Sequence, residues 1–386
     1  MFFELLLNGL AQGSLLALIC VGYSLAYGTA KVLNFAHADV MIAGGGYLVL
    51  LFVTTPHSSA LLPVGMALVF SLAVSVVTWS WSRGFNKSST ARIALTLGGG
   101  IIIGGLILGL AGKLPFLVST ILAIPLTASL AAALYQVVYL PLIHRNVPRT
   151  SILVASFGAS IALESLLLIF WGGQRRVFPL DVLPSFLVAR TPPENSGLWV
   201  SVFDYGTLPI GSFLQLPVRD ILILIVFVVV GLTLALFFRF SRLADAIIAT
   251  ADDRLAARAC GVPVDRVLCY AFFLGGAIAS LGGTLYVLRA ASLDPMSGFT
   301  PGVLAFVACV LGGIGSLKGS IAGAFLVGVI MSLAPAIPVD KWVLSVLPHT
   351  WAPWLPSLKL GDWSYGVVYV LMIVAILFKP KGLFTR

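Results

Sequence analysis

The sequence contains few charged residues for its length. Only 10% of its 386 residues are Asp, Glu, Lys or Arg, whereas soluble domains carry roughly 25%. Hydrophobic residues make up 59% of the chain, and its mean hydropathy is +1.07. This composition excludes a soluble globular protein and indicates a membrane protein. The net charge of +9 does not indicate a nucleic-acid partner, because the basic residues are scattered in short segments between apolar runs.

Several motifs of catalysis and metal binding are also missing. The four cysteines, Cys20, Cys260, Cys269 and Cys309, form no CxxC pair, so we expect no metal site and no disulfide. There is no GxxxxGK[ST] loop, so ATP would have to be hydrolysed by another chain. The sequence contains neither HExxH nor GxSxG, and we expect neither enzymatic activity nor a cofactor. The first apolar run lacks the charged start and the cleavage site of a signal peptide, which predicts a retained span.

Nine apolar runs are long enough to cross the hydrocarbon core of a bilayer, which takes about 20 helical residues. They lie at 5–29, 36–54, 60–82, 93–112, 115–140, 151–171, 219–240, 267–288 and 363–378. A further apolar stretch, 302–335, is interrupted by Gly312, Gly313, Gly315 and Ser316. The pattern predicts an all-α polytopic membrane protein with one membrane domain over residues 1–386. Inspection of the sequence shows no internal repeat.

The distribution of Lys and Arg predicts the orientation, because cytoplasmic segments are enriched in both. Most of them fall in cytoplasmic segments if the N-terminus is outside and the C-terminus is cytoplasmic. The long segment 172–218 is then external, and 241–266 is the one sizeable cytoplasmic loop. The stretch 302–335 must then begin and end on the outer side. We expect either a re-entrant hairpin or a pair of short spans there, turning at Gly312–Ser316.

Asn34, His37 and Asp39 stand between two apolar runs and are followed by Gly44-Gly45-Gly46. Polar and ionisable side chains are expensive inside a membrane, and those present there usually line a pathway. The three residues therefore predict a substrate path. The alternative for His37 is a structural hydrogen bond between helices.

Three further polar residues lie within apolar runs. Glu164 either lines the path or is buried in a hydrogen bond between helices. Asn8 and Gln12 are four residues apart and share one face of a helix. We assign both to the path, with helix packing as the alternative.

The cytoplasmic loop 241–266 has the pattern of a short capped helix. Asp252 is expected to cap a helix over 253–260, which Gly261 ends, with Pro263 beyond it. Arg254 and Arg258 share one face of this helix. Its mixed basic and apolar surface predicts docking to a soluble partner, the alternative being a solvated loop.

The segment Ala256-Ala257-x-x-x-Gly261 resembles the EAA loop of ABC-importer permeases, a short helix that sits in a groove of the ATPase subunit. More specifically, the chain resembles the LivH-type permeases of branched-chain amino acid importers. The segments that carry the resemblance are Leu7–Ser14, Tyr27-Gly28, Asn34–Asp39, Arg254–Arg266, Ala305–Ser320 and Lys379–Phe384. They occur in the family's order and reach both ends of the chain.

The resemblance implies the permease half of an importer in the bacterial cytoplasmic (inner) membrane. Such a chain would work with a second, homologous permease, two cytoplasmic ATPase subunits and an external substrate-binding protein, and would translocate branched-chain or related hydrophobic amino acids. The residues implied in ATPase coupling are Asp252, Arg254, Ala256, Ala257, Arg258, Gly261 and Asp265. Two alternatives are a urea or short-amide permease of the same family and a secondary transporter that couples ions through Asp39 and Glu164.

The chain departs from the family pattern at three places. Leu255 stands where the family usually has glutamate, and Ala38 where it usually has glycine. Residues 55–115 are longer than in the family and are expected to add at least one span. The external segment 172–218 is expected to receive the binding protein, or else to form a cap over the spans.

Overall fold

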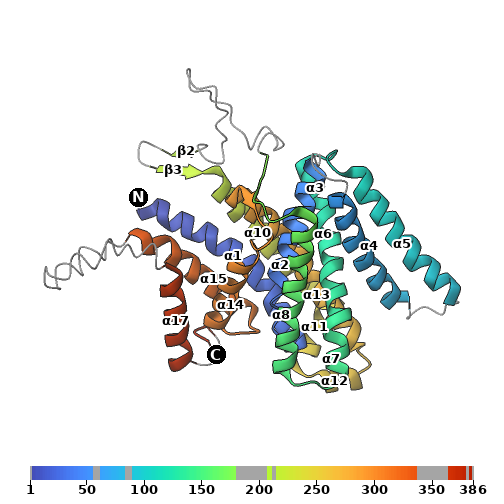
Figure 1. Cartoon of the computed structure of the whole chain (residues 1–386). Helices are drawn as coiled ribbons and strands as arrows, with labels where there is room; N and C mark the ends of the chain where they lie inside the picture. Colours follow the sequence, from blue (N-terminus) through green and yellow to red (C-terminus); the bar gives the residue numbers. More distant parts are fainter. Residues whose placement is uncertain are drawn as a thin grey trace, which may run out of the picture.

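The computed structural model describes residues 2–54, 61–82, 89–179, 207–210, 214–336, 364–379 and 382–384. The described helices are α1 (Phe2–Ala30), α2 (His37–Met41), η1 (Ile42–Leu48), α3 (Val49–Val53), α4 (Leu61–Ser82), α5 (Ser89–Leu110), α6 (Phe116–Leu134), η2 (Tyr135–Tyr139), α7 (Leu140–His144), α8 (Arg149–Trp171), α10 (Val218–Phe240), α11 (Arg242–Asp252), α12 (Arg254–Ala259), α13 (Val264–Ala290), α14 (Phe299–Gly312), α15 (Leu317–Leu333), η4 (Ala334–Ala336) and α17 (Ser364–Phe378). Figure 1 shows the helices as one bundle.

The structure confirms the prediction of an all-α polytopic membrane protein. Within the described ranges, seven helices are long and apolar enough to cross a membrane. Each of the nine apolar runs forms a helix or a chain of abutting helices. The only strands in the described part form two short pairs, β1 (Arg176–Val177) with β4 (Ser292–Leu293) and β2 (Thr207–Ile210) with β3 (Leu214–Pro217).

Two antiparallel helices, α1 and α13, form the centre of the bundle. Gly22 of α1 faces Gly275 of α13, where an added Cβ on Gly275 would lie 3.4 Å from the Gly22 Cα. Near the other end of the pair, Asn8 of α1 bonds to Arg289 of α13. Small residues let membrane helices approach closely and gain van der Waals contact. The glycines therefore explain why these two helices form the core pair.

The opposite side of α1 packs against α15 through a second set of small residues. Gly9 and Gly13 have the GxxxG spacing, and an added Cβ on Gly13 would lie 2.8 Å from the Phe325 Cα. The buried hydroxyl of Ser24 donates to that of Ser320 over 2.7 Å. The close glycine contacts and this hydrogen bond hold α15 against α1.

The order of elements after α1 occurs again after α13. Each of these long helices ends at a residue with left-handed backbone, Lys31 (φ 52°) or Ala291 (φ 54°). A non-helical segment follows, 31–36 or 291–298, and then a shorter helix, α2–α3 or α14. A full-length helix packs alongside each long one, α15 on α1 and α6 on α13. Because α1 and α13 are antiparallel, the two sets form an inverted repeat. The sequence itself shows no internal repeat, because the order of the elements is repeated and the side chains are not.

The stretch 302–335 forms two antiparallel helices, α14 and α15. The turn between them uses positive φ at Gly313 (111°) and Gly315 (88°), and the Ser316 hydroxyl accepts from the Gly319 N–H to begin α15. The stretch therefore turns where the sequence predicts. The two helices differ in length. Only α15 is long enough to cross a membrane, whereas the 14 residues of α14 extend about 21 Å.

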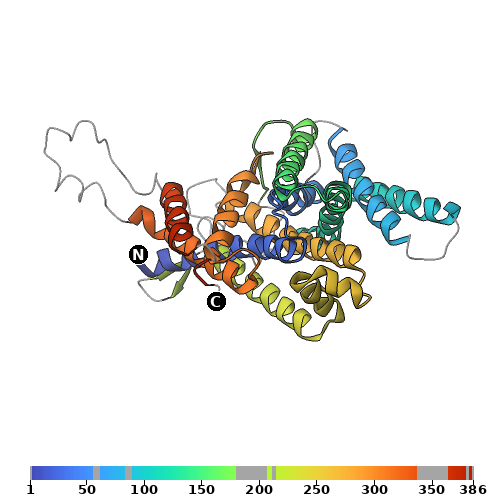
Figure 2. The ribbon, with the colours of Figure 1, turned by 90° about the horizontal axis from the view of Figure 1, so that it is seen from below.

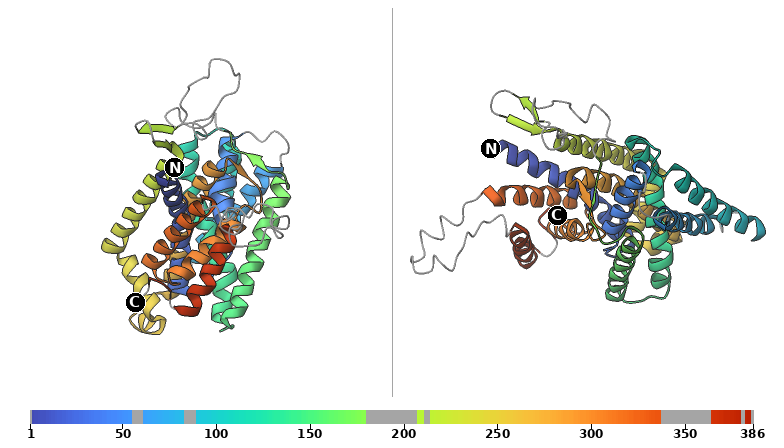
Figure 3. Two further views of the ribbon diagram at one scale, coloured as in Figure 1. Left: turned by 90° about the vertical axis from the view of Figure 1, so that its left-hand side faces the viewer. Right: turned by 45° about the horizontal axis from the view of Figure 1, so that its top comes forward.

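The two ends of the bundle carry different segments. The N-terminus and the β2–β3 hairpin lie together at one end, here called the N-terminal face (Figures 1 and 3). The outer ends of α13 and α15 reach the same face, since Ser332 donates to the Leu5 carbonyl. α11, α12 and the C-terminal segment lie at the other end, where the Leu383 N–H donates to the Leu311 carbonyl. Most of the segment 172–218 lies outside the described residues.

The additional region 55–115 contributes a helical hairpin at the edge of the bundle. α4 packs against α6 and α8, whereas α5 packs chiefly against α4. Seen from below, the pair projects away from the other helices (Figure 2). The prediction of added spans here is consistent with two 22-residue helices.

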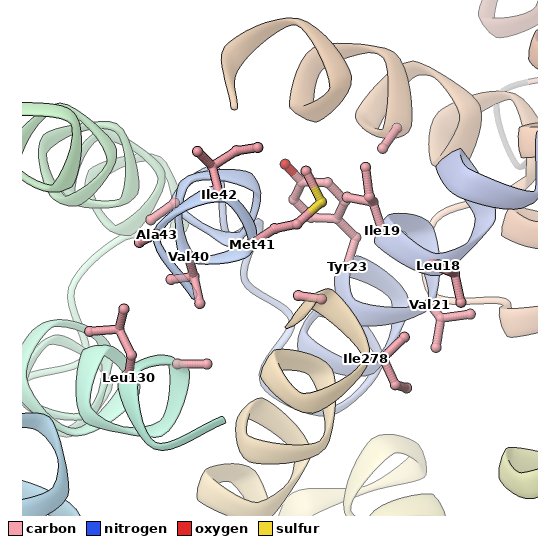
Figure 4. Packing of buried hydrophobic residues seen from close by; sticks show 14 of the residues in the cluster. Leu18, Ile19, Val21, Tyr23, Val40, Met41, Ile42, Ala43, Leu130 and Ile278 are labelled. Atoms are coloured by element: carbon pink, nitrogen blue, oxygen red, sulfur yellow. The ribbon is translucent and has the colours of Figure 1, made fainter. Parts of the chain in front are cut away.

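Buried apolar side chains fill the space between α1, α2, α6 and α13. Tyr23, Met41, Leu130 and Ile278 lie in this region (Figure 4). The helix that begins as α2 widens into a π-helix at η1, which contains Gly44, Gly45 and Gly46. Here the Thr284 hydroxyl donates to the Gly45 carbonyl over 3.1 Å. π-Bulges are frequent at functional sites, and this one directly follows the polar cluster.

Candidate functional site

Asn34, His37 and Asp39 lie inside the protein, each 2% exposed. After Lys31 the chain turns back, and α2 begins at His37, whose ring packs against Gly22 and against the Tyr23 ring at 5.4 Å between centroids. Gly22 precedes the end of α1 by eight residues, which corresponds to about 12 Å along the helix axis. The helix α2 therefore starts within the depth of the bundle. Irregular backbone at such depth occurs where protein or a water-filled cavity covers it.

Side chains from other helices bind two of the three residues. Asn34 Oδ1 accepts from the Tyr139 hydroxyl over 2.6 Å, and Asp39 Oδ2 accepts from the Ser160 hydroxyl. Glu164 is half-buried and lies one helical turn beyond Ser160 on α8. The structure therefore brings Glu164 into the neighbourhood of Asp39, as expected for a shared site.

Two atoms of the cluster have no hydrogen-bond partner within the described part of the chain. They are His37 Nε2 and Asp39 Oδ1, both buried. A buried polar group without a partner costs about 1–3 kcal/mol. Such groups in native structures call for a functional explanation or a bound water.

The start of α14 meets the start of α2 at this cluster. Gly298 precedes α14 and lies against Ala38 and Asp39, and an added Cβ on Gly302 would lie 2.7 Å from the Ala38 Cβ. The methyl group of Ala38, at a position where a glycine was expected, thus fills the contact with Gly302. Helix N-termini carry partial positive charge. Broken helices whose ends meet inside an inverted repeat form the polar sites of many transporters.

Asn8 and Gln12 do not join this cluster. Asn8 Oδ1 accepts from Arg289 Nη2 over 2.5 Å, and Arg289 Nη1 donates to Asp220 over 2.9 Å. Gln12 Nε2 donates to Met331 Sδ over 3.5 Å. Both belong to helix contacts near the N-terminal face, which favours the packing alternative for them.

Sequence reasoning missed the partner residues on α8 and η2. Ser156 accepts from the Phe35 N–H over 3.4 Å, and Ser160 and Tyr139 bind Asp39 and Asn34. A signal was present, because Ser156, Ser160 and Glu164 recur at four-residue spacing and so share one helix face. Tyr139 gave no comparable signal.

The loop 241–266 contains two helices at the end opposite the N-terminal face. Asp253, rather than the predicted Asp252, caps α12, with its Oδ1 accepting from the Leu255 N–H over 2.8 Å. The prediction is wrong by one residue because α11 continues through Asp252. Gly261 follows α12 with φ +83°, the left-handed conformation that ends a helix.

Contacts from α12 tie it to three other segments. Arg254 Nε donates to the Thr29 carbonyl of α1 over 3.0 Å, and burial lowers the pKa of its guanidinium. Asp265 of α13 lies 3.7 Å from Arg258 and 3.2 Å from His144 of α7. Through these contacts α12 is linked directly to α1, and through Asp265 to α13 and α7.

The outward face of α12 is partly apolar. Ala257 is buried, whereas Ala256 is exposed and Leu255 is 79% exposed. Leu255, at the position where a glutamate was expected, thus presents an aliphatic side chain to solvent.

A polytopic helical bundle with a buried cluster of polar and ionisable side chains at its centre is typical of a membrane transport permease. The sequence matches the family described as branched-chain amino acid transport system / permease component over residues 5–376, and the chain belongs to this family. Family members are membrane-embedded components of multi-subunit transporters.

Curated relatives span the whole chain. It is 25% identical over 386 residues to the high-affinity branched-chain amino acid transport system permease protein BraD of Pseudomonas aeruginosa, covering 100% of this chain and 96% of the relative. It is 27% identical over 385 residues to the permease protein LivH of the same kind of system in Salmonella typhimurium, with the same coverage. A shorter similarity, 33% over 100 residues, links it to the autoinducer 2 import system permease protein LsrC of Yersinia pseudotuberculosis, covering 24% of this chain and 28% of the relative.

Proposed function

We propose that this chain is the permease subunit of an ABC importer that carries branched-chain or related hydrophobic amino acids across the bacterial inner membrane. The observation that carries the proposal is the family match over residues 5–376, together with relatives of the same named function that align with the whole chain. The energy comes from ATP hydrolysed by separate subunits.

The path runs beside the polar cluster where α2 and α14 meet. A branched-chain amino acid has two charged ends and an aliphatic side chain. Asp39 suits the ammonium group, and the N-termini of α2 and α14 suit the carboxylate. The unpartnered His37 Nε2 and Asp39 Oδ1 support this assignment, because a passing substrate offers them partners. Contacts along a path must be weak enough to release the substrate, so affinity resides in an external binding protein.

The N-terminal face is external, and the face with α11 and α12 is cytoplasmic. This orientation follows the distribution of Lys and Arg. One of the two ATPase subunits docks on α12 at Leu255, Ala256 and Arg258. The binding protein meets the segment 172–218, and a second homologous permease completes the membrane unit.

The experiment is uptake by proteoliposomes that contain the chain with its partner permease, its ATPases and its binding protein. We expect ATP-dependent uptake of leucine, with urea and short amides transported poorly. Preferential urea uptake would instead support the short-amide alternative. Liposomes without the ATPases are the control. Uptake there, driven by an ion gradient, would show an ion-coupled secondary transporter that uses Asp39 and Glu164.

A further inference from the structure

A cavity of about 430 Å³ lies between the end of α1, the α7–α8 connection and the α11–α12 loop. These segments meet at the end of the bundle opposite the N-terminal face (Figure 1). The size falls in the range of small-molecule sites, roughly 300–1,000 Å³. The polar cluster of Asn34, His37 and Asp39 does not line this cavity.

The cavity lining includes two residues with a buried polar atom that lacks a partner in the described part of the protein. Thr250 is 1% exposed, and its Oγ1 has no hydrogen-bond partner. Arg254 uses Nε to bind Thr29, but its buried Nη2 is unpaired. Each such atom costs about 1–3 kcal/mol unless something binds it. A hydroxyl and a guanidinium N–H that belong to residues lining one cavity are suitable donors for a carboxylate.

Charged and aliphatic side chains complete the lining. Lys31 and Arg149 add positive charge, and Asp252 and Asp253 add negative charge. Within the described ranges, none of these four is in an ion pair. The remaining wall includes aliphatic side chains, namely Val32, Ile143, Val147 and Ile152. The cavity thus offers one group of cations, one of carboxylates and an apolar wall.

We propose that this cavity binds a free aliphatic amino acid as its zwitterion. The carboxylate lies at Arg254 and Thr250, the ammonium group at Asp252, and the side chain against Val32 and Ile152. Neither a simple anion nor a simple cation would use both sets of charges. The apolar wall distinguishes an aliphatic amino acid from a polar one.

The position of the cavity gives the bound amino acid a regulatory effect. It bridges the α11–α12 loop to the end of α1, four residues before Asn34. An occupant stabilises this arrangement by its binding free energy and so resists motion of α12 relative to α1. Amino acid accumulated in the cytoplasm therefore slows further uptake. This regulatory part rests on the proposed function and orientation, whereas the binding itself does not.

The first test is leucine binding to the purified chain in nanodiscs, without ATPases or binding protein, by calorimetry and thermal shift. We expect saturable binding that Thr250→Val weakens at least tenfold and Asp252→Asn also weakens. Thr233→Val is the matched control, because the Thr233 hydroxyl bonds within its own helix to the Val229 carbonyl. Thr250→Val is expected to fold at least as stably as the wild type, since it removes an unpaired hydroxyl.

Two further probes separate this cavity from the transport path. His37 does not line the cavity, so in a His37→Ala background leucine should still bind saturably and Thr250→Val should still weaken that binding at least tenfold. The compounds 4-methylpentanoate and 3-methylbutylamine, which each lack one charge, should bind weakly. The proposal is overturned if leucine shows no saturable binding, or binds wild type and Thr250→Val equally.

The second test uses the complete transporter in proteoliposomes preloaded with leucine. Preloading should lower the initial uptake rate of the wild type but not of Thr250→Val. If transport proceeds and preloading has no effect on the wild type, the regulatory role is wrong while the proposed function stands. If ATPase assembly abolishes leucine binding to the wild type, an ATPase side chain fills the cavity, and the regulatory role is again overturned.

Discussion

Arg254 in α12 donates a hydrogen bond to the main-chain oxygen of Thr29 in the last turn of α1, with 3.0 Å between the two atoms. Hydrogen bonds from charged donors contribute about 1.5–3 kcal/mol. α12 is the helix that we propose contacts the ATPase, and α1 leads within five residues to Asn34. The bond therefore connects the proposed docking helix to the helix that leads into the polar cluster.

Replacing Arg254 should weaken the coupling of ATP hydrolysis to transport. Arg254→Met keeps a long side chain but removes the donor to Thr29. We expect the ATPases still to assemble, while the amount of leucine transported per ATP falls severalfold. Arg242→Met, at an exposed position in α11, is the control. An unchanged ratio of transport to hydrolysis in Arg254→Met would show that coupling takes another route.

His37→Ala and Asp39→Ala should lower the maximal uptake rate, with little change in the substrate concentration for half-maximal uptake. The reason is that the cluster contributes weak contacts along the path, whereas affinity belongs to the binding protein. Uptake has to be normalised to the amount of inserted protein. If only the amount of protein falls, and the normalised rate is that of the wild type, the three residues serve helix packing.

Gly22→Ala should destabilise the protein, because the added methyl group would overlap the His37 ring. Overpacking of this kind costs about 1–3 kcal/mol. Gly231→Ala is the matched control, since nothing lies within 4 Å of a Cβ added there. Thermal unfolding in detergent should show a lower midpoint for Gly22→Ala alone. Equal midpoints for the two variants would contradict the close packing of α1 on His37.

Arg289→Met should destabilise the protein more strongly than Gly22→Ala does. It leaves Asp220, which is 4% exposed, without its closest cation. Removing one partner of a buried ion pair costs about 3–5 kcal/mol. The double variant Arg289→Met/Asp220→Leu should recover most of the loss, as measured by unfolding in mixed micelles. A double variant less stable than Arg289→Met would mean that Asp220 has another essential partner.

The native Cys260 reports the orientation, because it is exposed in the α12–α13 connection while the other three cysteines are buried. A membrane-impermeant thiol reagent should label it in inside-out vesicles but not in intact cells. In a Cys260→Ser background, Val177→Cys should show the reverse, since Val177 is 74% exposed in β1. Labelling of Cys260 in intact cells would place the N-terminus in the cytoplasm.

The spans and the turn at Gly312–Ser316 were predictable because each depends on a short stretch of sequence. An apolar run of about 20 residues or a cluster of glycines is visible without knowledge of the fold. The cap of α12 was misplaced by one residue, since its position depends on where α11 ends. The inverted repeat was not predictable, because it lies in the order and packing of the helices and is not repeated in the side chains.

The candidate site, like the fold, was predictable from the sequence only in part. Asn34, His37 and Asp39 lie within six residues, so the sequence alone groups them. Their partners Tyr139 and Ser160 lie 105 and 121 residues further along the chain from the groups that they bind. The prediction that Asn8 and Gln12 line the path rests on their residue type and on their shared helix face. Their actual partners, Arg289 and Met331, are set by which helices pack against α1.

The peripheral attachment of α5 has a consequence for how such chains diversify. Within the described residues, α5 packs chiefly on α4, and α4 packs mainly on α6 and α8, with Trp81 of α4 also in contact with Tyr270 and Phe273 of α13. The hairpin is therefore a unit that evolution can gain or lose with little repacking of α1 or of the meeting point of α2 and α14. The outward side chains of α5, such as Ile101 and Ile102, enlarge the perimeter in contact with lipid. Two chains of this family can thus have different numbers of spans and the same transport machinery.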